Sequence, residues 1–247
     1  MKALILAAGY ATRLRPLTDD FPKQLLPVGG RPIVDWILDN IREAGIDDVH
    51  LVTNARFAPL FDEWAATRGV TVHDDGTSSN ETRLGAIGDI QFVDLRDDLL
   101  VVAGDNLFDF TLSGFIDFWR GHGDSAVAVY DVGDRELVKK YSVVELVDER
   151  IVRFEEKPAD PQSTLIATAT YLFSAADVAR VGDYLAEGNP PDQPGNYVGW
   201  LARTSTIYGY RFAGEWYDIG DLGQLLEADN RLRARQGLPE RTSYTVD

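Results

Sequence analysis

The sequence predicts an α/β fold in which helices cover both faces of a mostly parallel, mixed sheet, giving three layers. Over the first half of the chain, short apolar runs alternate with amphipathic helical patterns, and the runs at 3–6 and 99–103 end in glycine-containing loops. Alternation of this kind is typical of βαβ units, whose parallel strands are buried on both faces. Ligands bind such sheets beyond the carboxyl ends of the strands. The loop at 7–32 and the loop at Asp105 are therefore the first places to expect a site.

The first half of the chain supplies the parallel strands. Residues 3–6 form a buried strand that runs into the Ala7-Ala8-Gly9 turn. The helix that follows begins at Pro32, which suits a first helical turn, and Gly45 closes it. The remaining elements expected in this half are a strand at 49–54, a helix at 57–68, a strand at 70–72, a loop at 74–85 and a strand at 99–103.

From about residue 124 the pattern becomes strand-rich. The expected elements are strands at 125–132, 141–147, 150–158 and 165–173, a helix at 174–186, a surface loop at 187–195 and a final helix at about 221–235. No internal repeat or clear linker separates the parts. We therefore expect a single domain over residues 1–247, made of a first half to about 123, a strand-rich lobe at about 124–220 and the C-terminal helix.

The composition excludes several kinds of site and partner. The chain has no cysteine, so disulfides, thiolate nucleophiles and thiolate-bound metals are ruled out, and its three histidines lack the spacing of a zinc site. A net charge of −16 argues against nucleic acid and anionic membranes as partners, because both would repel the chain. The first apolar run is too short for a signal peptide, and no run reaches the roughly 20 residues of a membrane span. We expect a cytoplasmic protein.

Residues 7–32, AAGYATRLRPLTDDFPKQLLPVGGRP, form a basic loop within this acidic chain. A glycine-containing turn after a strand offers free backbone N–H groups to an anion. Arg13 and Lys23 add charge-assisted hydrogen bonds, which suits the polyphosphate of a nucleoside triphosphate. The loop is neither a dinucleotide-binding fingerprint nor a Walker loop, because it lacks the required glycine and the G-K-[ST] run. The alternative interpretation is a solvated basic loop.

The stretch LAAGYATRLRPLTDDFPKQLLPVGGRPIVDW resembles the signature of the sugar-1-phosphate nucleotidyltransferases, best known from glucose-1-phosphate thymidylyltransferases. Three later segments resemble further motifs of that family in the same order, VVAGDNLF at 101–108, FEEKP at 154–158 and WYDIGD at 216–221. The resemblance implies a three-layer, Rossmann-like nucleotidyltransferase fold with a nucleotide-binding first half and a strand-rich lobe that binds the sugar. One departure is Ala11, where many members of the family have glycine.

The resemblance also implies roles for residues of this chain. The implied nucleotide-binding residues are Leu6, Ala7, Ala8, Gly9, Arg13, Asn80 and Gly85. The implied substrate-binding residues are Ser142, Glu156, Lys157 and Thr170. The implied catalytic residues are Arg13, Lys23 and Asp105, and the implied Mg²⁺ ligands are Asp105 and Asp218. Taken singly, each has a structural alternative, such as a helix cap, a turn residue or a surface ion pair.

The reaction implied by the resemblance joins a nucleoside triphosphate to a sugar-1-phosphate, with glucose-1-phosphate as the expected sugar, and releases pyrophosphate. The nucleophile is a phosphate oxygen that is already ionised, so no general base is required. The obstacle is repulsion between two anions. In-line attack on the α-phosphorus therefore calls for positioning, cationic side chains and Mg²⁺.

Two departures from the family pattern leave the acceptor open. Ser142 stands where the thymidylyltransferases typically have glycine, and Thr168 and Thr170 stand where an Asn-x-Gly-like pattern is common. The added bulk predicts altered selectivity, for another hexose phosphate, a cyclitol phosphate or phosphocholine receiving a cytidylyl group. Outside the enzymes, the alternative is a catalytically silent nucleotide-sensing homologue. The base is not specified, and a homo-oligomer is compatible with the resemblance.

Overall fold

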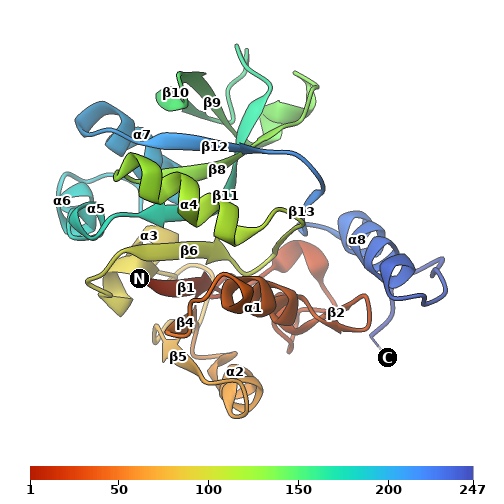
Figure 1. Ribbon diagram of the computed structural model, residues 1–247. Coiled ribbons are helices and arrows are strands. Elements are labelled where there is room, and N and C mark those ends of the chain that lie inside the picture. Colours follow the sequence, from red (N-terminus) through yellow and green to blue (C-terminus); the bar gives the residue numbers. More distant parts are fainter. Residues whose placement is uncertain (247) are drawn as a thin grey trace.

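A nine-stranded mixed sheet runs through the computed structural model, which describes residues 1–246 (Figure 1). The strands follow one another across the sheet in the order β5-β4-β1-β6-β11-β8-β12-β10-β9. In that order they span Val70–Asp74, Val49–Thr53, Lys2–Leu6, Leu99–Ala103, Leu165–Phe173, Ala126–Asp131, Tyr208–Phe212, Arg150–Glu156 and Ser142–Val147. Strands β10 and β11 run against the direction of the others, which confirms the mostly parallel, mixed sheet.

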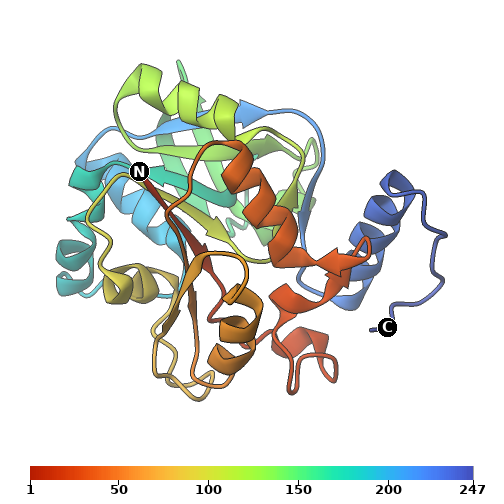
Figure 2. The same cartoon turned by 60° about the horizontal axis from the view of Figure 1, so that its bottom comes forward.

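Helices cover both faces of the sheet, and neighbouring residues of β1 show why both faces need cover (Figure 2). The side chain of Ile5 packs in a core with helices α1, α2 and α4, whereas that of Leu4 packs in a second core with helices α3, α5, α6 and α7. Burying one such side chain stabilises a fold by about 1.5–3 kcal/mol. The three-layer arrangement is therefore confirmed. The helices span Ile33–Glu43 (α1), Ala58–Ala65 (α2), Ala86–Val93 (α3), Leu112–His122 (α4), Ala175–Val178 (α5), Val181–Ala186 (α6) and Pro194–Thr204 (α7).

Two short antiparallel ribbons lie at the carboxyl edge of the central strands. β7 (Asn106–Phe108) directly follows β6 and pairs with β13 (Trp216–Asp218), so two distant parts of the chain meet there. β2 (Pro27–Val28) pairs with β3 (Arg31–Pro32) at the end of the first loop. After β13 the chain enters α8 (Leu222–Arg235), which packs on β2 and matches the expected final helix (Figure 1).

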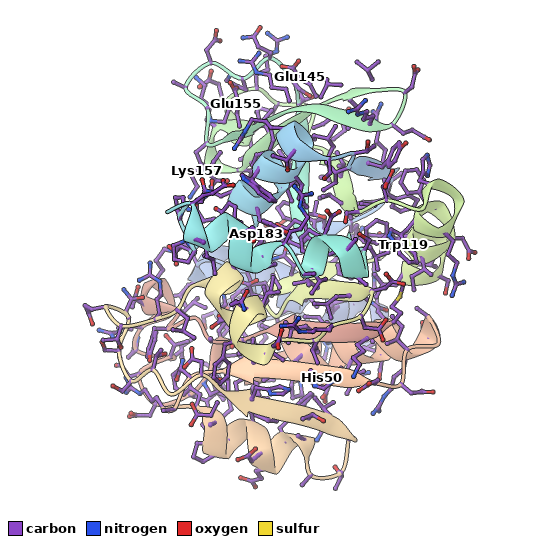
Figure 3. All side chains as sticks on the ribbon, turned by 90° about the vertical axis from the view of Figure 1, so that its left-hand side faces the viewer. His50, Trp119, Glu145, Glu155, Lys157 and Asp183 are labelled. Atoms are coloured by element: carbon purple, nitrogen blue, oxygen red, sulfur yellow. The ribbon has the colours of Figure 1, made fainter. Side chains whose placement is uncertain are left out.

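The strands that follow residue 124 continue the sheet of the first half. β11 pairs with β6 on one side and with β8 on the other. The hairpin of β9 and β10 comes last in the strand order, and β9 also pairs back with β11, where Val143 lies opposite Ile166, so this end of the sheet closes on itself. Figure 3 shows Glu145 and Glu155 on this hairpin and Lys157 just beyond its end, well away from His50 in the first half.

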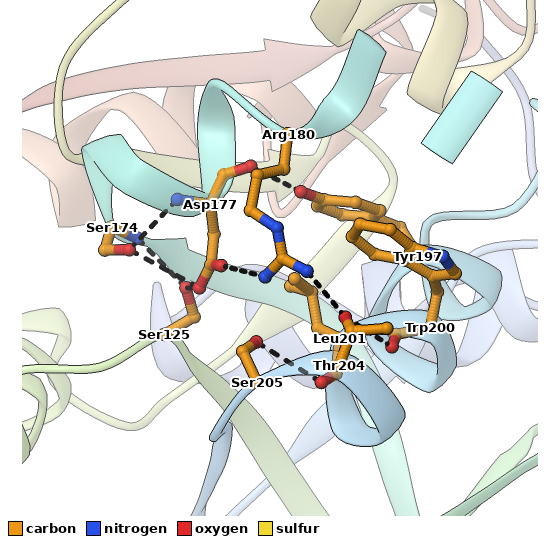
Figure 4. A network of polar contacts seen from close by, with 9 residues as sticks. All are labelled: Ser125, Ser174, Asp177, Arg180, Tyr197, Trp200, Leu201, Thr204 and Ser205. Atoms are coloured by element: carbon orange, nitrogen blue, oxygen red, sulfur yellow. Dashed lines mark hydrogen bonds and ion pairs between the residues drawn. The ribbon is translucent and has the colours of Figure 1, made fainter. Parts of the chain in front are cut away.

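The predicted continuous helix at 174–186 is wrong, because the segment folds as two helices, α5 and α6. Arg180 sits between them and is held by its own contacts (Figure 4): its guanidinium donates to Asp177 at 3.1 Å and to the hydroxyl of Thr204 on α7 at 2.8 Å. The hydroxyl of Ser125 donates to the same Asp177 at 2.6 Å. This network therefore ties α5 and α7 to the start of β8.

The predicted surface loop at 187–195 is shorter than expected, because α7 already begins at Pro194. Its last residues also pack against α3, as described below. Across residues 1–246, no helix has both the length and the hydrophobicity that a membrane span requires, and α8, the longest, has 14 residues.

Candidate active site

The first loop begins at the carboxyl end of β1, a strand with a neighbour on each side. The strand is fixed by parallel pairing with β4 on one side and β6 on the other. The amide of Asn54 donates to the carbonyl of Ala8 at 2.9 Å, which holds the turn after the strand. Ala11 follows with a φ of 44°, a conformation that glycine adopts more easily than other residues. At this position many members of the family that the sequence resembles have glycine.

A cavity of about 160 Å³, here called the small cavity, opens between this turn and the start of α3. It is lined by Leu6, Ala8, Gly9, Arg83, Gly85, Ala86, Asp89 and Asp192. Four of the residues expected to contact the nucleotide thus lie together. Ala7 is buried under the turn, and Asn80 is exposed outside the cavity, where its carbonyl accepts a hydrogen bond from Arg83 at 2.7 Å.

Gly85 allows the segment before α7 to approach α3. Its φ is 80°, and a Cβ atom there would lie 2.7 Å from both the Cα of Asp192 and the carbonyl oxygen of Pro191. The N–H of Ile87 donates to that carbonyl at 2.8 Å. Arg83 closes the contact with two hydrogen bonds of 2.8 Å to the Asp192 carboxylate, which lower the pKa of Asp192. The lobe and the first half are therefore joined beside the small cavity.

Lys23 and Asp105 form a close ion pair at the carboxyl end of β6. Lys23 belongs to the short 3-10 helix at Lys23–Leu25, and its side chain is 9% exposed. Its ammonium lies 2.5 Å from Oδ2 of Asp105 and donates to the carbonyl of Ile219 at 2.7 Å. The amide of Asn106 donates to the other carboxylate oxygen at 2.9 Å. Burial opposes ionisation of Asp105, but Lys23 and these hydrogen bonds outweigh it and lower its pKa.

Asp218 reaches the same place from the end of β13. It stands in register with Asn106 of β7, and the next N–H, that of Ile219, donates to the carbonyl of Asp105 at 3.1 Å. Burial, followed by the negative charge of Asp105, raises the pKa of Asp218 to about 6, while Lys23 acts in the opposite direction. The two aspartates are therefore close enough for the charge of Asp105 to shift the pKa of Asp218.

Arg13 approaches this pair from the short 3-10 helix at Thr12–Leu14. A Cβ atom on Gly220 would lie 3.3 Å from both terminal nitrogens of Arg13, so the guanidinium rests against the backbone next to Asp218. The side chain is exposed, and within residues 1–246 no carboxylate forms an ion pair with it. Such a guanidinium is available to an incoming anion.

A second cavity of about 440 Å³, here called the large cavity, lies between this cluster and the β9–β10 hairpin. Its charged lining residues are Arg13, Asp105, Lys140, Glu156, Lys157, Asp192 and Asp218. Lys23 does not line the large cavity, but it contacts Asp105, which does.

The hairpin contributes a second polar group to the large cavity. Ser142 and Glu156 face each other in register across β9 and β10, and the serine hydroxyl donates to the glutamate. Lys157 has a φ of 45°, and its N–H donates to the carbonyl of Tyr141 at 3.0 Å. Its ammonium lies 3.5 Å from Glu156, and the side chain is 55% exposed. Lys157 therefore pairs with Glu156 and keeps most of its charge open to solvent.

The structure does not bring Thr170 to either cavity. Its side chain is fully buried in β11, and its hydroxyl has no hydrogen-bond partner among the described residues. β11 is irregular between Ala167 and Tyr171, with Ala169 at a φ of 52°. This irregularity places Thr168, Ala169 and Tyr171 on the wall of the large cavity. A shift of one residue along a strand exchanges the faces to which its side chains point.

Sequence reasoning missed several lining residues, namely Arg83, Asp89, Tyr171 and Asp192. Asp89 is four residues after Gly85, so both lie on one side of the start of α3, and this spacing was an available signal. Tyr171 follows the threonines that drew attention in β11. Burial, and next the charge of Glu156, raise the pKa of Tyr171, so its hydroxyl stays protonated and able to donate. Asp192 carried no signal, because it lies in a stretch typical of surface loops.

The residues present fit a magnesium ion. No group of three or more His, Cys, Asp or Glu side chains that could hold a metal occurs within residues 1–246. Mg²⁺ does not need such a group, since it is bound through one or two carboxylates together with phosphate oxygens and water. Burial, followed by the negative charge of Asp105, raises the pKa of Asp218, and a divalent cation held by these two hard oxygen donors would offset the repulsion between them. Asp105 and Asp218 are therefore suited to a metal that arrives with a polyphosphate.

Comparison with known proteins gives matches over nearly the whole chain. Residues 2–235 match the family model described as nucleotidyl transferase. A UTP–glucose-1-phosphate uridylyltransferase of Synechocystis sp. is 30% identical over 96% of this chain. A glucose-1-phosphate adenylyltransferase of Clostridium novyi is 28% identical over 93% of it. The chain spans 64% and 66% of the length of these two relatives.

Solved structures give the same fold. A UDP-glucose pyrophosphorylase of Acinetobacter baumannii superposes with a TM-score of 0.78 and covers 96% of both chains. The two sequences are 22% identical, so the likeness is one of fold alone. The predicted three-layer α/β architecture thus agrees with the helices and strands described above, and known structures share it.

Proposed function

The chain belongs to the nucleotidyl transferase family, and from this premise we propose that it joins a nucleoside triphosphate to a sugar-1-phosphate. The products would be a nucleoside-diphosphate sugar and pyrophosphate. One observation carries the proposal: Arg13, Lys23, Asp105 and Asp218 converge at one end of the large cavity, from four separate segments of the chain.

The proposed reaction has a simple balance of bonds. An oxygen of the acceptor phosphate attacks the α-phosphorus and forms a new P–O bond. The bond from the α-phosphorus to the oxygen that bridges it to the β-phosphorus breaks, and pyrophosphate leaves with that electron pair. The attacking oxygen is already ionised, so no proton must be removed. The demand on the protein is to hold two anions together, which requires positioned cations.

The cations of the site are arranged to meet that demand. Arg13, which is exposed and lies next to Asp218, would bind the β- and γ-phosphates that leave. Lys23 is buried and would direct its charge toward the α-phosphate while holding Asp105 in place. Lys157, on the other side of the large cavity, would bind the acceptor phosphate. The three cations would thus serve three different phosphate groups.

Asp105 and Asp218 would hold Mg²⁺ when it is present. Bound there, the ion would offset negative charge on the phosphate oxygens. The low pKa of Asp105 keeps this carboxylate ionised and ready to bind. The pKa of Asp218, raised to about 6, leaves it mostly ionised at pH 7 or above.

The two cavities would divide the substrates between them. The backbone of Leu6, Ala8 and Gly9, together with Gly85, would surround the base in the small cavity. In the large cavity, Glu156 would accept hydrogen bonds from hydroxyl groups of the acceptor, with Ser142 fixing the carboxylate. Glucose-1-phosphate is the acceptor we expect.

A second acceptor, phosphocholine, is favoured by one specific feature of the large cavity. Tyr141 and Trp216 both line it, and their rings meet edge to face with centroids 5.3 Å apart. Aromatic faces attract quaternary ammonium groups. Transfer of a cytidylyl group to phosphocholine is therefore the alternative reaction to test.

A pyrophosphate-release panel tests the proposal. Five nucleoside triphosphates (ATP, CTP, GTP, UTP and dTTP) are crossed with glucose-1-phosphate, other hexose-1-phosphates, a cyclitol phosphate and phosphocholine, each with and without Mg²⁺. We expect acceptor-dependent release with at least one sugar-1-phosphate, and only when Mg²⁺ is present. Release with phosphocholine alone would establish the alternative. Nucleotide binding without release for any pair would instead indicate a silent, nucleotide-sensing homologue.

A further inference from the structure

Asp192 lies at the boundary between the two cavities. Within residues 1–246, it is the one residue that lines both the small and the large cavity. Its main chain is fixed against the start of α3, because its carbonyl accepts from the N–H of Ala86 at 3.3 Å and the carbonyl of Pro191 accepts from the N–H of Ile87 at 2.8 Å. The proposed reaction gives Asp192 no task, although it would adjoin both substrates.

Arg83 fixes the carboxylate of Asp192 without using all of its acceptor sites. Nε of Arg83 donates to Oδ1 and Nη2 donates to Oδ2, each at 2.8 Å. Within residues 1–246, no other protein group donates to this carboxylate. Because each carboxylate oxygen has two lone pairs, one acceptor site remains on each oxygen. The side chain is 46% exposed, so a ligand in the cavities can reach these sites.

The charge of the carboxylate suits it to accept hydrogen bonds and not to donate them. The hydrogen bonds from Arg83 lower the pKa of Asp192, so the group is ionised at neutral pH. The guanidinium also offsets the negative charge of Asp192, which would otherwise repel a polyphosphate in the large cavity. The boundary therefore offers two fixed acceptor sites to a group that donates.

The ribose is the part of a nucleotide that would cross this boundary. In the proposed function the base lies in the small cavity, and the α-phosphate lies beside Lys23 and Asp105 at the large cavity. The ribose links the base to the phosphates, and its 2′- and 3′-hydroxyls are neighbouring donors. A carboxylate binds the ribose 2′-hydroxyl for the same reason in dinucleotide-binding folds.

We propose that Asp192, held by Arg83, binds the 2′- and 3′-hydroxyls of the ribose and selects ribonucleoside triphosphates over their 2′-deoxy counterparts. The inference rests on the proposed function for the placement of the base and the α-phosphate. It adds a preference that neither the fold nor the family fixes.

The preference follows from the loss of one donor. A 2′-deoxyribose presents a C–H group to the carboxylate oxygen that would accept from the 2′-hydroxyl. The bound sugar also excludes water from that oxygen, so an ionised acceptor is left without its partner. Hydrogen bonds to ionised groups are stronger than those between neutral groups, and a site built for a hydroxyl rejects the analogue that lacks it.

Equilibrium binding tests the inference without any acceptor. Isothermal titration calorimetry with Mg²⁺ would compare four pairs that differ only in the 2′-hydroxyl: ATP with dATP, CTP with dCTP, GTP with dGTP, and UTP with dUTP. For the base that binds most tightly, we expect the ribonucleotide to bind about tenfold or more tightly than its 2′-deoxy partner. Equal dissociation constants within that pair would overturn the inference.

Asp192→Ala removes the carboxylate and gives a second readout. We expect the ratio of the two dissociation constants to fall to about one, whatever happens to the overall affinity. Asp131→Ala is the matched control, because Asp131 pairs with Arg211, is 45% exposed and lies outside both cavities. This control should keep the wild-type ratio. A wild-type ratio in folded Asp192→Ala would assign the preference to another group and overturn the inference.

Arg83→Met tests the positioning role of Arg83. The carboxylate of Asp192 would lose both hydrogen bonds that orient it, so we expect the ratio to fall part of the way toward one. A purely structural role would weaken the binding of both members of a pair equally and leave the ratio unchanged. That result in a folded variant would refute the role given to Arg83.

The outcomes separate the inference from the proposed function. A preference for ribonucleotides that depends on Asp192, without turnover for any acceptor, would refute the proposed enzyme and retain the inference. Turnover with equal kcat/KM values for the ribo and 2′-deoxy forms would retain the enzyme and refute the inference. If none of the eight nucleotides binds, both are refuted.

Discussion

The ammonium of Lys23 lies 2.5 Å from the carboxylate of Asp105, although 82 positions separate the two residues in the chain. The contact forms because β1 and β6 are adjacent parallel strands, so the loops that leave them start at the same edge of the sheet. The second hydrogen bond of Lys23, to the carbonyl of Ile219, adds a third segment to the same point. A buried lysine held in this way provides a fixed positive charge beside two aspartates.

Lys23→Met should remove that charge with little change in side-chain volume. We expect kcat for pyrophosphate release to fall by about 100-fold or more, as for the loss of one group that stabilises developing negative charge. Lys139→Met serves as the control, since the partly exposed Lys139 pairs with Glu136 on the surface. Wild-type kcat in Lys23→Met would exclude the proposed role of Lys23.

Ser142→Gly should change the choice of acceptor. The substitution removes the hydroxyl that donates to Glu156, and it opens space next to Gly195 at the start of α7. We expect the order of kcat/KM values across the acceptor panel to change, while the order among the nucleotides stays the same. The exposed Ser243→Gly is the control. An unchanged acceptor profile would mean that Ser142 does not face the acceptor.

Gly85→Ala should separate the lobe from α3. The new Cβ atom would meet the backbone of Pro191 and Asp192 at 2.7 Å, in addition to the cost of a φ of 80°. Gly123→Ala is a control for a positive φ, because its φ is 79°, its ψ is −4° and nothing lies within 4 Å of its Cβ position. That left-handed conformation costs about 1–2 kcal/mol, whereas Gly85, with a ψ of 160°, lies in a region that is essentially reserved for glycine, and overpacking adds about 1–3 kcal/mol there.

Urea unfolding of the two glycine variants measures this difference. Gly85→Ala should lose more free energy of unfolding than Gly123→Ala and should also bind nucleotides more weakly. Equal losses in the two variants would show that the close approach at Gly85 does not matter for stability.

Asp89→Asn should change how stability depends on pH. The pKa of Asp89 is about 7 in the folded protein, against 3.8 for an aspartate without these interactions. Between these two pH values the folded state holds a proton that the unfolded state releases. Asp89 therefore makes stability fall as pH rises from about 4 to about 7, by up to about 1.4 kcal/mol per pH unit. Asparagine is similar in size and does not ionise.

Thermal unfolding at several pH values tests this expectation. The difference in Tm between Asp89→Asn and wild type should be small at pH 4, grow up to about pH 7 and then level off. The control Asp94→Asn, at the end of the same helix where Asp94 pairs with Arg96, should show no such growth. A difference for Asp89→Asn that stays constant with pH would contradict the raised pKa of Asp89.

Elements with a strong local pattern were predictable from the sequence. The apolar face of α1 and the buried run of β6 follow from periodicity alone. Helix α7 was not predictable in this way, because it contains Gly195 and Gly199. Both glycines lie against the ring of Phe154 on β10, where a Cβ atom would be 2.5 Å and 3.1 Å from ring carbons. Close packing against Phe154 requires glycine at both positions. Because glycine has a low helix propensity, the sequence pattern did not predict the helix.

Site residues that belong to a sequence motif could be predicted. Those whose orientation depends on an irregular stretch of backbone could not. The order of the motifs was enough to expect Asp105 and Asp218 in one place. Thr170 was misplaced because an irregular turn of β11 at Ala169 changes which side chains face the large cavity. Asp89 was missed because its spacing from Gly85 was the one local signal, and its burial and the nearby charge of Asp75 arise only in the folded sheet.

Asp105→Asn tests most directly whether the charged cluster at the large cavity performs nucleotidyl transfer. Pyrophosphate release would be measured at saturating Mg²⁺ for this variant and for Asp117→Asn, a control on the exposed face of α4. We predict that Asp105→Asn loses at least about 100-fold in kcat and keeps a folded structure by circular dichroism, while the control keeps its activity. Full activity in folded Asp105→Asn would contradict the account.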